Sequence, residues 1–255
     1  MDDRIVDEEV SSEMAPHWLI EQRWDRMLFA HWRVDPAALK RLLPCGAEPD
    51  VGFGSAWVGI VAFVMTGTRA VLPLHFPALP PIPELNLRTY VRVDGVPGVW
   101  FLSLDATSPL FVNAGHALYG LNYRRARMLV VADCGSTYYA SVSGGAAFVA
   151  RYRPVAAPES PAPGSLAHFL VERYRFFAKR HGTLMTAEVE HEPWRLQAAE
   201  AEIAVNRMAV RGLALDGEPV LHVSAGVQAR ISAPERVVPA RLSPIRASAT
   251  LRRRR

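Results

Sequence analysis

Cysteine and lysine are scarce in this sequence, and each scarcity excludes a class of chemistry. The only cysteines, Cys45 and Cys134, lack the spacing of a zinc site or a disulfide framework. Cys134 ends an apolar run and Cys45 lies in a turn, so we expect buried structural thiols rather than nucleophiles. Lys40 and Lys179 are the only lysines, because all other basic residues counted with them are arginines. A mechanism that needs an amine nucleophile therefore has two candidates in the whole chain.

Long hydrophobic runs and catalytic signature motifs are also missing. No apolar stretch reaches the roughly 18 residues that a membrane helix needs. The acidic start, "MDDRIVDEEVSSE", has no hydrophobic segment of the kind found in secretory signals. We therefore predict no membrane partner and a cytoplasmic location. The sequence has no Gly-x-Ser-x-Gly elbow, no phosphate-binding glycine loop and no paired-histidine helix. We predict neither a metal site nor a cofactor.

The net charge of +4 invites a nucleic-acid interpretation, but the charge is concentrated at one end. From Arg230 onward the chain has eight arginines and one acidic residue, whereas the preceding part has 21 basic and 24 acidic residues. The segment "SPIRASATLRRRR" is typical of a solvated tail that contacts polyanions without specificity. We therefore do not expect functional nucleic-acid binding. We expect an acidic tail over residues 1–13, a single domain over 14–238 and a disordered basic tail over 239–255.

Strand-like segments outnumber helical ones. "WDRMLFAHWRVD", "SAWVGIVAFVM", "ELNLRTYVRVDG" and "VPGVWFLSLDA" have strand patterns, and the last two are predicted to pair as a hairpin at Asp94-Gly95. Further strands are predicted over 126–132, 137–143, 146–153, 184–190, 220–223 and 227–231. "DPAALKRLLP", "SPLFVNAGHALYG" and "SLAHFLVERYRFFAKR" have the caps and spacing of helices, and the proline-rich segment 72–83 is predicted to be a loop. This pattern predicts an α+β domain built on a large antiparallel sheet or barrel.

One predicted strand has a polar face that fits two interpretations. Its side chains alternate between a polar and an apolar row: Glu84, Asn86, Arg88, Tyr90 and Arg92 against Leu85, Leu87, Thr89, Val91 and Val93. The polar row is either the solvated face of an antiparallel strand or the floor of a cavity that binds an acidic ligand. The next predicted strand is apolar on both faces except at Ser103 and Asp105, which favours the cavity only slightly.

Several segments, taken in order, resemble a known family. They are "LFAHWRVDPAALKRLLP", "AWVGIVAF", "PELNLRTYVR", "GVWFLSLDA" and "ALYGLNYRRARM", with weaker matches in "EPWRL" and "LHVSAGV". The chain resembles the acetoacetate-decarboxylase-like superfamily, specifically its uncharacterised YqjF-like branch. The resemblance implies a large, mostly antiparallel β-barrel with a central cavity and helices packed outside. Decarboxylases of that fold attack a ketone through a lysine whose pKa is lowered by an adjacent lysine.

The resemblance also implies positions for the site residues. Tyr123 in "LNYRR" stands at the position of the nucleophilic lysine, Arg124 at that of its partner, and Glu84 matches an active-site glutamate. Tyrosine cannot form an imine and arginine stays protonated, so we do not expect Schiff-base decarboxylation. Related decarboxylases form large assemblies, which leaves a homo-oligomer open.

Two hypotheses for the function follow. The leading one is a small-molecule-binding barrel, as an enzyme or a binding protein, that takes a small acidic or carbonyl metabolite without imine chemistry. Tyr123 and Glu84 are its catalytic candidates, and the expected substrate contacts are Arg88, Arg124, Tyr90, Asn86 and His116, for the last of which a structural histidine is the alternative. The competing hypothesis is a non-catalytic sensor or scaffold whose barrel is largely filled by side chains such as Trp57, Phe63, Trp100 and Phe101.

Overall fold

The computed structural model describes residues 18–71, 77–208 and 213–238, which are mostly in β-strands. The strands are β1 (Trp18–Val34), β2 (Ala47–Pro49), β3 (Ala56–Ala70), β4 (Ile82–Val93), β5 (Val96–Ala106), β6 (Tyr123–Arg125), β7 (Arg127–Asp133), β8 (Ser136–Ser143), β9 (Ala146–Pro154), β10 (Arg175–Arg180), β11 (Thr183–His191), β12 (Gln197–Asn206), β13 (Val220–Ser232) and β14 (Glu235–Arg236). The helices are α1 (Pro36–Lys40), α2 (Pro109–Tyr119) and α3 (Leu166–Val171). No helix among the described residues is long and apolar enough to cross a membrane. The two predicted tails, and residues 72–76 of the predicted loop, lie outside the described residues.

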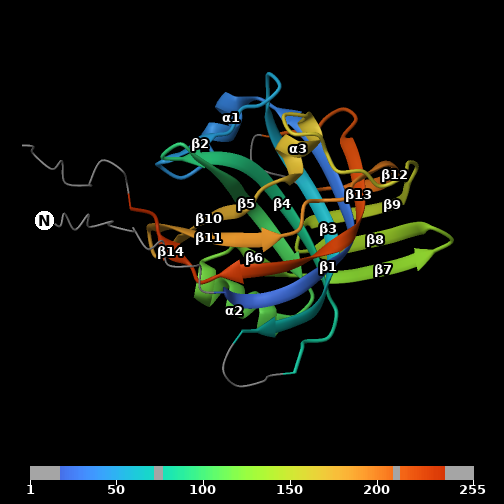
Figure 1. Cartoon of the computed structure of the whole chain (residues 1–255), viewed down its shortest axis with the longest axis horizontal. Coiled ribbons are helices and arrows are strands. Elements are labelled where there is room, and N and C mark those ends of the chain that lie inside the picture. The colour runs from blue at the N-terminus through green and yellow to red at the C-terminus, as the bar shows by residue number, and fades with distance from the viewer. Residues whose placement is uncertain (1–17, 72–76, 209–212, 239–255) are drawn as a thin grey trace, which may run out of the picture.

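Seven strands form a closed hydrogen-bonded circuit in the order β11-β10-β5-β4-β3-β1-β13 (Figure 1). The circuit closes because β11 pairs with β13, from Val189 opposite Ile231 to His191 opposite Ala229. Neighbouring strands are antiparallel except β10 and β5, which are parallel. From β13 the hydrogen-bonded order continues through β12, β9 and β8 to β7. The predicted hairpin of β4 and β5 is confirmed, with Asp94 and Gly95 both at positive φ in its turn.

Two apolar clusters pack on opposite sides of the same strands, because successive side chains of a strand point to opposite faces. Met27 and Phe29 of β1 belong to the cluster inside the circuit, together with Phe63 of β3. Leu28 of β1 and Leu85 of β4 belong to the outer cluster, which Tyr139, Phe148 and Tyr152 of β8 and β9 complete. The strands that follow β13 therefore cover the outer face of the circuit.

Helices α2 and α3 contribute to the inner cluster, so the expectation that the helices pack only outside is wrong. Figure 1 shows α3 in the upper part of the view and α2 in the lower part. Helix α2 begins after its N-cap Ser108 with Pro109 and ends at Gly120 (φ 71°), as the sequence predicts. Its residues Val112 and Tyr119 are buried against the inner faces of the strands.

Helix α3 is shorter than predicted. Ser165 caps it as expected, but the helix ends at Val171, and the segment from Arg175 forms β10 instead. There Phe176 and Ala178 face the inner cluster while Phe177 packs in a separate one. Pairing with β5 and β11 gives these residues a strand's alternation, which overrides the helix-like spacing.

The C-terminal strands also differ from the prediction. Residues 220–232 form one continuous strand, β13, rather than two. Strand β12 was not predicted, although its side chains alternate between half-buried and exposed along its whole length. Every second residue of "QAAEAEIAVN" after Gln197 is apolar, but the first two of these are alanines and glutamates stand between them, and both residue types are depleted in strands.

Both cysteines are exposed, so the prediction of buried thiols is wrong. Cys134 lies at the tip of the β7–β8 hairpin at a positive φ of 45°, followed by Gly135 at 77°. Two consecutive residues at positive φ are what a tight hairpin turn requires, and such a turn projects its side chains into solvent.

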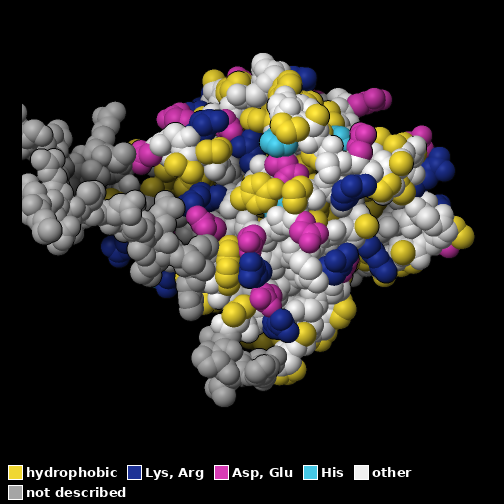
Figure 2. Space-filling model, in the orientation of Figure 1, with side chains coloured by type: hydrophobic (Ala, Val, Ile, Leu, Met, Phe, Trp, Pro, Cys, Tyr) yellow, Lys and Arg dark blue, Asp and Glu magenta, His cyan; other side chains and the backbone are white. Residues whose placement is uncertain are grey.

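Figure 2 shows acidic and basic side chains interspersed over the face of the molecule in view. Exposed ion pairs join neighbouring strands of the circuit, Arg69 with Glu21 across β3 and β1, and Arg230 with Glu190 across β13 and β11. Such pairs add little stability individually. Their mixed sign agrees with the near-neutral count for the chain before Arg230.

Candidate functional site

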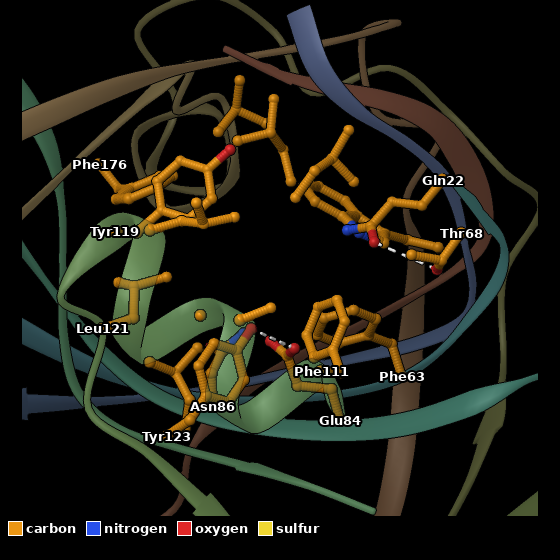
Figure 3. A pocket seen from close by; sticks show the side chains of 18 of the residues that line it. Gln22, Phe63, Thr68, Glu84, Asn86, Phe111, Tyr119, Leu121, Tyr123 and Phe176 are labelled. Atoms are coloured by element: carbon orange, nitrogen blue, oxygen red, sulfur yellow. Dashed lines mark hydrogen bonds between the residues drawn. The ribbon is translucent and has the colours of Figure 1, made fainter. Parts of the chain in front are cut away.

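A pocket of about 510 Å³ lies within the strand circuit (Figure 3). Strands β1, β3, β4, β5 and β10 and helix α2 all contribute to its wall, as do Pro77 and Leu79 from the segment that precedes β4. Most of the wall is apolar, with Phe63, Phe111 and Phe176 among its large side chains. The polar and charged side chains that line it are Gln22, Thr68, Arg69, Glu84, Asn86, Arg88, Tyr119 and Tyr123.

Glu84 and Tyr123 form the buried polar centre of this wall. The Tyr123 hydroxyl donates a hydrogen bond of 2.7 Å to Glu84 Oε2, and the two residues are only 4% and 7% exposed. Glu84 comes from β4, and Tyr123 comes from β6, which pairs with β5 directly after the end of α2. Gly115 of α2 makes room for the phenol, because a Cβ there would lie 2.5 Å from Tyr123 Cδ2. The phenol is therefore held between the helix and the carboxyl group.

The local environment favours the neutral forms of both side chains. Burial raises the pKa of Glu84 to about 7, against the opposing hydrogen bonds from Tyr123 and Asn86. Burial, followed by the charge of Glu84, raises the pKa of Tyr123 well above its usual value. Tyr123 therefore acts as a hydrogen-bond donor that keeps its proton, whereas Glu84 can gain or lose a proton near neutral pH.

Arg88 brings a positive charge to the pocket without a carboxylate beside it. Its Nη2 donates to the Leu170 carbonyl at 3.2 Å, and its buried Nε has no hydrogen-bond partner among the described residues. No ion pair found within the described chain includes Arg88. Asn86, one alternation earlier on β4, has a buried Oδ1 that likewise lacks a partner. Both side chains thus keep hydrogen-bonding capacity on the pocket wall.

The cavity interpretation of the polar row on β4 is therefore supported for its first three members. Glu84, Asn86 and Arg88 line the pocket. Tyr90 belongs to the apolar cluster inside the circuit but does not line the pocket. Its hydroxyl donates to the Leu170 carbonyl at 2.6 Å, and His31 Nε2 lies 2.7 Å from that hydroxyl. Arg92 is exposed, as the alternative interpretation expected of the whole row.

Two expected substrate contacts lie away from the pocket. Arg124 follows Tyr123 in β6 and so points to the opposite face, where its Nε donates to Asp105 Oδ1 at 2.7 Å. His116 is exposed on α2, and the pocket lining does not include it. The predictions that Arg124 and His116 face the ligand are wrong in this geometry.

The inward stripe of α2 was the signal that sequence reasoning missed. Phe111, Gly115 and Tyr119 follow one another at intervals of four residues, the spacing of one helix face, and all three line the pocket. His116 is displaced from that face by one residue. Gln22 and Thr68 were missed as well; Thr68 Oγ1 donates to Gln22 Oε1 at 3.3 Å on the wall opposite Glu84 (Figure 3).

Neither lysine lies in the wall of this pocket. Lys40 forms an ion pair with Glu48 beside α1, and Lys179 is exposed on β10. Within the described residues, the pocket lining includes the Tyr123 phenol and neither of the two candidate amines. The chemistry available here is hydrogen bonding, proton transfer and charge stabilisation.

Solved structures with a similar fold include acetoacetate decarboxylases and an acetoacetate-decarboxylase-like enzyme from Sphingomonas wittichii. The enduracididine biosynthesis enzyme MppR, complexed with pyruvate, superposes with a TM-score of 0.62 at 13% identity, covering 90% of this chain and 94% of that one. Acetoacetate decarboxylase from Legionella pneumophila subsp. pneumophila superposes with a TM-score of 0.62 at 13% identity, covering 93% and 98%. At these identities the likeness establishes the fold alone.

Sequence comparison gives the family directly. The model of DUF2071, described as an uncharacterized conserved protein, matches residues 21–228. The chain is also 40% identical over 210 residues to the uncharacterized protein YqjF of Bacillus subtilis, covering 80% of this chain and 87% of that one. The chain belongs to the DUF2071 family, and the resemblance to YqjF-like proteins read from its sequence is confirmed.

Proposed function

We propose that this protein binds a small acidic or carbonyl-bearing metabolite in the pocket and acts on it by acid–base chemistry at Glu84 and Tyr123, without an imine. The strand circuit serves in this proposal as a barrel around the ligand. The buried hydrogen bond between Tyr123 and Glu84 in the wall of a 510 Å³ pocket is the observation that carries the proposal. One structural neighbour is complexed with pyruvate and another is named for acetoacetate, and both compounds carry a carbonyl and a carboxylate.

Each polar side chain has a role that follows from its surroundings. The ligand carbonyl oxygen accepts the hydrogen bond that Tyr123 otherwise donates to Glu84. Released from that bond, the ionised Glu84 takes a proton from the carbon next to the carbonyl, and the electron pair of the broken C–H bond moves to the oxygen to form an enolate. Arg88, whose buried Nε has no partner among the described residues, holds the carboxylate or the enolate oxygen. Asn86 Oδ1, an acceptor without a partner there, is free to bind a hydroxyl or N–H donor of the ligand. Protonated Glu84 exchanges its proton with solvent and then delivers a solvent-derived proton to the same carbon, as the electron pair returns from the enolate oxygen.

The apolar wall supports a further feature of the ligand. A pocket with apolar side chains over most of its surface, phenylalanine and leucine among them, favours a ligand with a hydrocarbon or aromatic body and few polar atoms. We therefore expect longer or aromatic 2-oxo and 3-oxo acids to bind more tightly than pyruvate or acetoacetate.

Proton exchange measures the proposed chemistry directly. The protein is incubated in D₂O with a panel of oxo acids and ketones that first give a thermal shift, and deuterium incorporation next to the carbonyl is followed by NMR. We expect Glu84→Gln to slow exchange by about 100-fold or more, and Tyr123→Phe by about 10-fold or more. Tyr152→Phe is the matched control, because that buried phenol donates to the Arg26 carbonyl and belongs to the outer cluster.

Two results would contradict the proposal. Exchange that survives Glu84→Gln at the wild-type rate would remove Glu84 from catalysis, and a borohydride-trapped adduct on Lys40 or Lys179 would restore imine chemistry. The second candidate function, a non-catalytic sensor, is favoured by the apolar wall. A sensor predicts ligand-induced stabilisation without any proton exchange. The pocket volume of about 510 Å³ argues against the variant of this hypothesis in which side chains largely fill the barrel.

A further inference from the structure

Strand β7 lies at the end of the hydrogen-bonded strand order, and none of its residues lines the pocket. It pairs with β8 on one side, and within the described ranges no strand pairs with its other side. Figure 1 shows the β7–β8 hairpin at the border of the sheet. Such an edge presents unpaired main-chain N–H and C=O groups, and proteins usually protect it with lysine, proline or a bulge. "RMLVVAD" has no such protection between its ends, and its register with β8 is regular throughout.

The side chains of β7 have a symmetrical pattern. Arg127 and Asp133, of opposite charge, occupy the two ends of the strand and share one face with Leu129 and Val131. Leu129 is 55% exposed and Val131 is 45% exposed. The exposed apolar residues lie at the centre of the open edge, and the opposite charges lie at equal distances on either side. An antiparallel copy of the same strand therefore matches apolar with apolar residues and each charge with its opposite.

The tight turn of the hairpin sets which main-chain groups are free. A two-residue turn at Cys134 and Gly135 makes the flanking residues, Asp133 and Ser136, a hydrogen-bonded pair. Hydrogen bonding then alternates along the strand, so Asp133 and every second residue before it direct their N–H and C=O groups toward β8. Met128, Val130 and Ala132 direct theirs toward the open edge.

We propose that β7 pairs antiparallel with β7 of a second copy of this chain, about a two-fold axis at Val130, to form a homodimer with a continuous sheet. In this register Val130 faces Val130 and Met128 faces Ala132 of the second copy. These are the residues with free main-chain groups, and together they form about six hydrogen bonds across the seam. Leu129 packs opposite Val131, and Arg127 lies opposite Asp133, each twice by symmetry.

Other registers lose part of this complementarity. A shift by two residues places Arg127 opposite Val131 or Asp133 opposite Leu129, so a charge faces an apolar side chain. A shift by one residue puts main-chain groups that already bind β8 at the seam. A parallel arrangement in register brings Arg127 next to Arg127. The centred antiparallel register alone satisfies both the charges and the main chain.

Sedimentation velocity of the full-length protein over about two decades of concentration tests the dimer. We expect the wild type to change from monomer to dimer as concentration rises. Arg127→Asp and Asp133→Arg each place two pairs of like charges across the seam, and each should weaken the dimer by roughly tenfold or more. Both residues are exposed in the monomer, so neither substitution disturbs its core. Arg41→Asp, an exposed change beside α1, is the control that should leave dimerisation unchanged.

Mixing the two single variants tests the register itself. One variant then has acidic residues at both ends of β7 and the other has arginine at both ends, so their heterodimer regains two pairs of opposite charges. The double variant R127D/D133R regains them within a homodimer. We expect both the mixture and the double variant to recover the wild-type dissociation constant within about threefold. A protein that stays monomeric at every concentration, or a dimer that ignores both single charge changes, overturns the proposal.

Discussion

Tyr123 and Arg124 are neighbours in one strand, yet they place two carboxyl groups in different chemical situations. On the inner face of the circuit, the neutral Tyr123 phenol donates to Glu84 at 2.7 Å. On the outer face, the Arg124 guanidinium donates to Asp105 at 2.7 Å. Both carboxyl groups are almost fully buried. The two partners differ in charge, and they lie on opposite faces because a strand turns successive side chains to opposite faces.

A buried carboxyl group is either held in its ionised form by a neighbouring cation or left free to titrate. Burial raises the pKa of Asp105, but the hydrogen bond and the positive charge of Arg124 oppose that rise. Among the described residues no cation is hydrogen-bonded to Glu84, and burial raises its pKa to about 7. The inner pair, Glu84 and Tyr123, can therefore exchange a proton near neutral pH. The outer pair, Asp105 and Arg124, serves as a structural ion pair.

Removal of the outer cation should have the largest effect on stability. Arg124→Met leaves the buried Asp105 carboxylate without its cation, and we expect the free energy of unfolding at pH 8 to fall by about 3 kcal/mol. Tyr123→Phe removes a neutral donor and should cost about 1 kcal/mol. Urea denaturation of both variants measures the difference. A smaller loss for Arg124→Met than for Tyr123→Phe would contradict the assignment of the two faces, as would a loss of ligand affinity in Arg124→Met.

The pH dependence of stability should distinguish the inner pair. The pKa of Glu84 is about 7 in the folded protein against a reference value of 4.5. Between these values the folded state holds a proton that the unfolded state has released, so stability falls as pH rises through this window. Glu84→Gln cannot ionise. We expect its stability relative to the wild type to increase from pH 4.5 to pH 8 by on the order of 2 kcal/mol, as measured by urea denaturation.

Other groups titrate in the same range but do not affect this difference. Burial lowers the pKa values of His31, His191 and His222, so these side chains destabilise the folded state as pH falls, in the wild type and the variant alike. Glu218→Gln, at an exposed position, is the matched control and should follow the wild type at every pH. A pH-independent difference between Glu84→Gln and the wild type would refute the raised pKa.

The inner pair could be anticipated from the sequence, whereas its outer counterpart could not. The unbroken alternation of β4 grouped Glu84, Asn86 and Arg88 on one face, and resemblance to decarboxylases placed Tyr123 near them. Arg124 was assigned to the same site because the resemblance places it beside Tyr123, at the position of the partner lysine. Residues 123–125 instead pair with β5 as a strand, and that pairing is a long-range contact that the local sequence does not encode.

A backbone irregularity hid Gln22 from sequence reasoning. Arg26 has a positive φ of 56°, and the register of β1 against β3 shifts between Asp25 and Leu28. Before this bulge the even-numbered residues of β1, such as Gln22, face the pocket; after it the odd-numbered residue Met27 does. A continuous alternation from Leu28 backward would have placed Gln22 on the outer face, and β1 itself contains no glycine that marks the bulge.

A methyl group added at Gly115 keeps the Tyr123 phenol but displaces it, and so tests whether the position of the ring matters. Alanine there would place its Cβ 2.5 Å from Cδ2 and 2.6 Å from Cε2 of Tyr123, so the ring must move away from its present position beside Glu84. Alanine also favours the helix by about 1 kcal/mol, which offsets part of the strain in the free energy of unfolding. We expect Gly115→Ala to reduce the affinity for any pocket ligand by roughly tenfold while the stability changes by less than about 1 kcal/mol.

The titration of Glu84 gives this variant a second measurement. The hydrogen bond from Tyr123 lowers the pKa of Glu84, so displacement of the phenol should raise that pKa. The pH range over which the free energy of unfolding falls should then extend to higher pH. Gly145→Ala is the control, because a Cβ at that hairpin tip meets no atom within 4 Å. If Gly115→Ala kept both the wild-type affinity and the wild-type pH window, the contact between α2 and the phenol would be mere packing. The difference between the two faces of β6 would then rest on strand alternation alone.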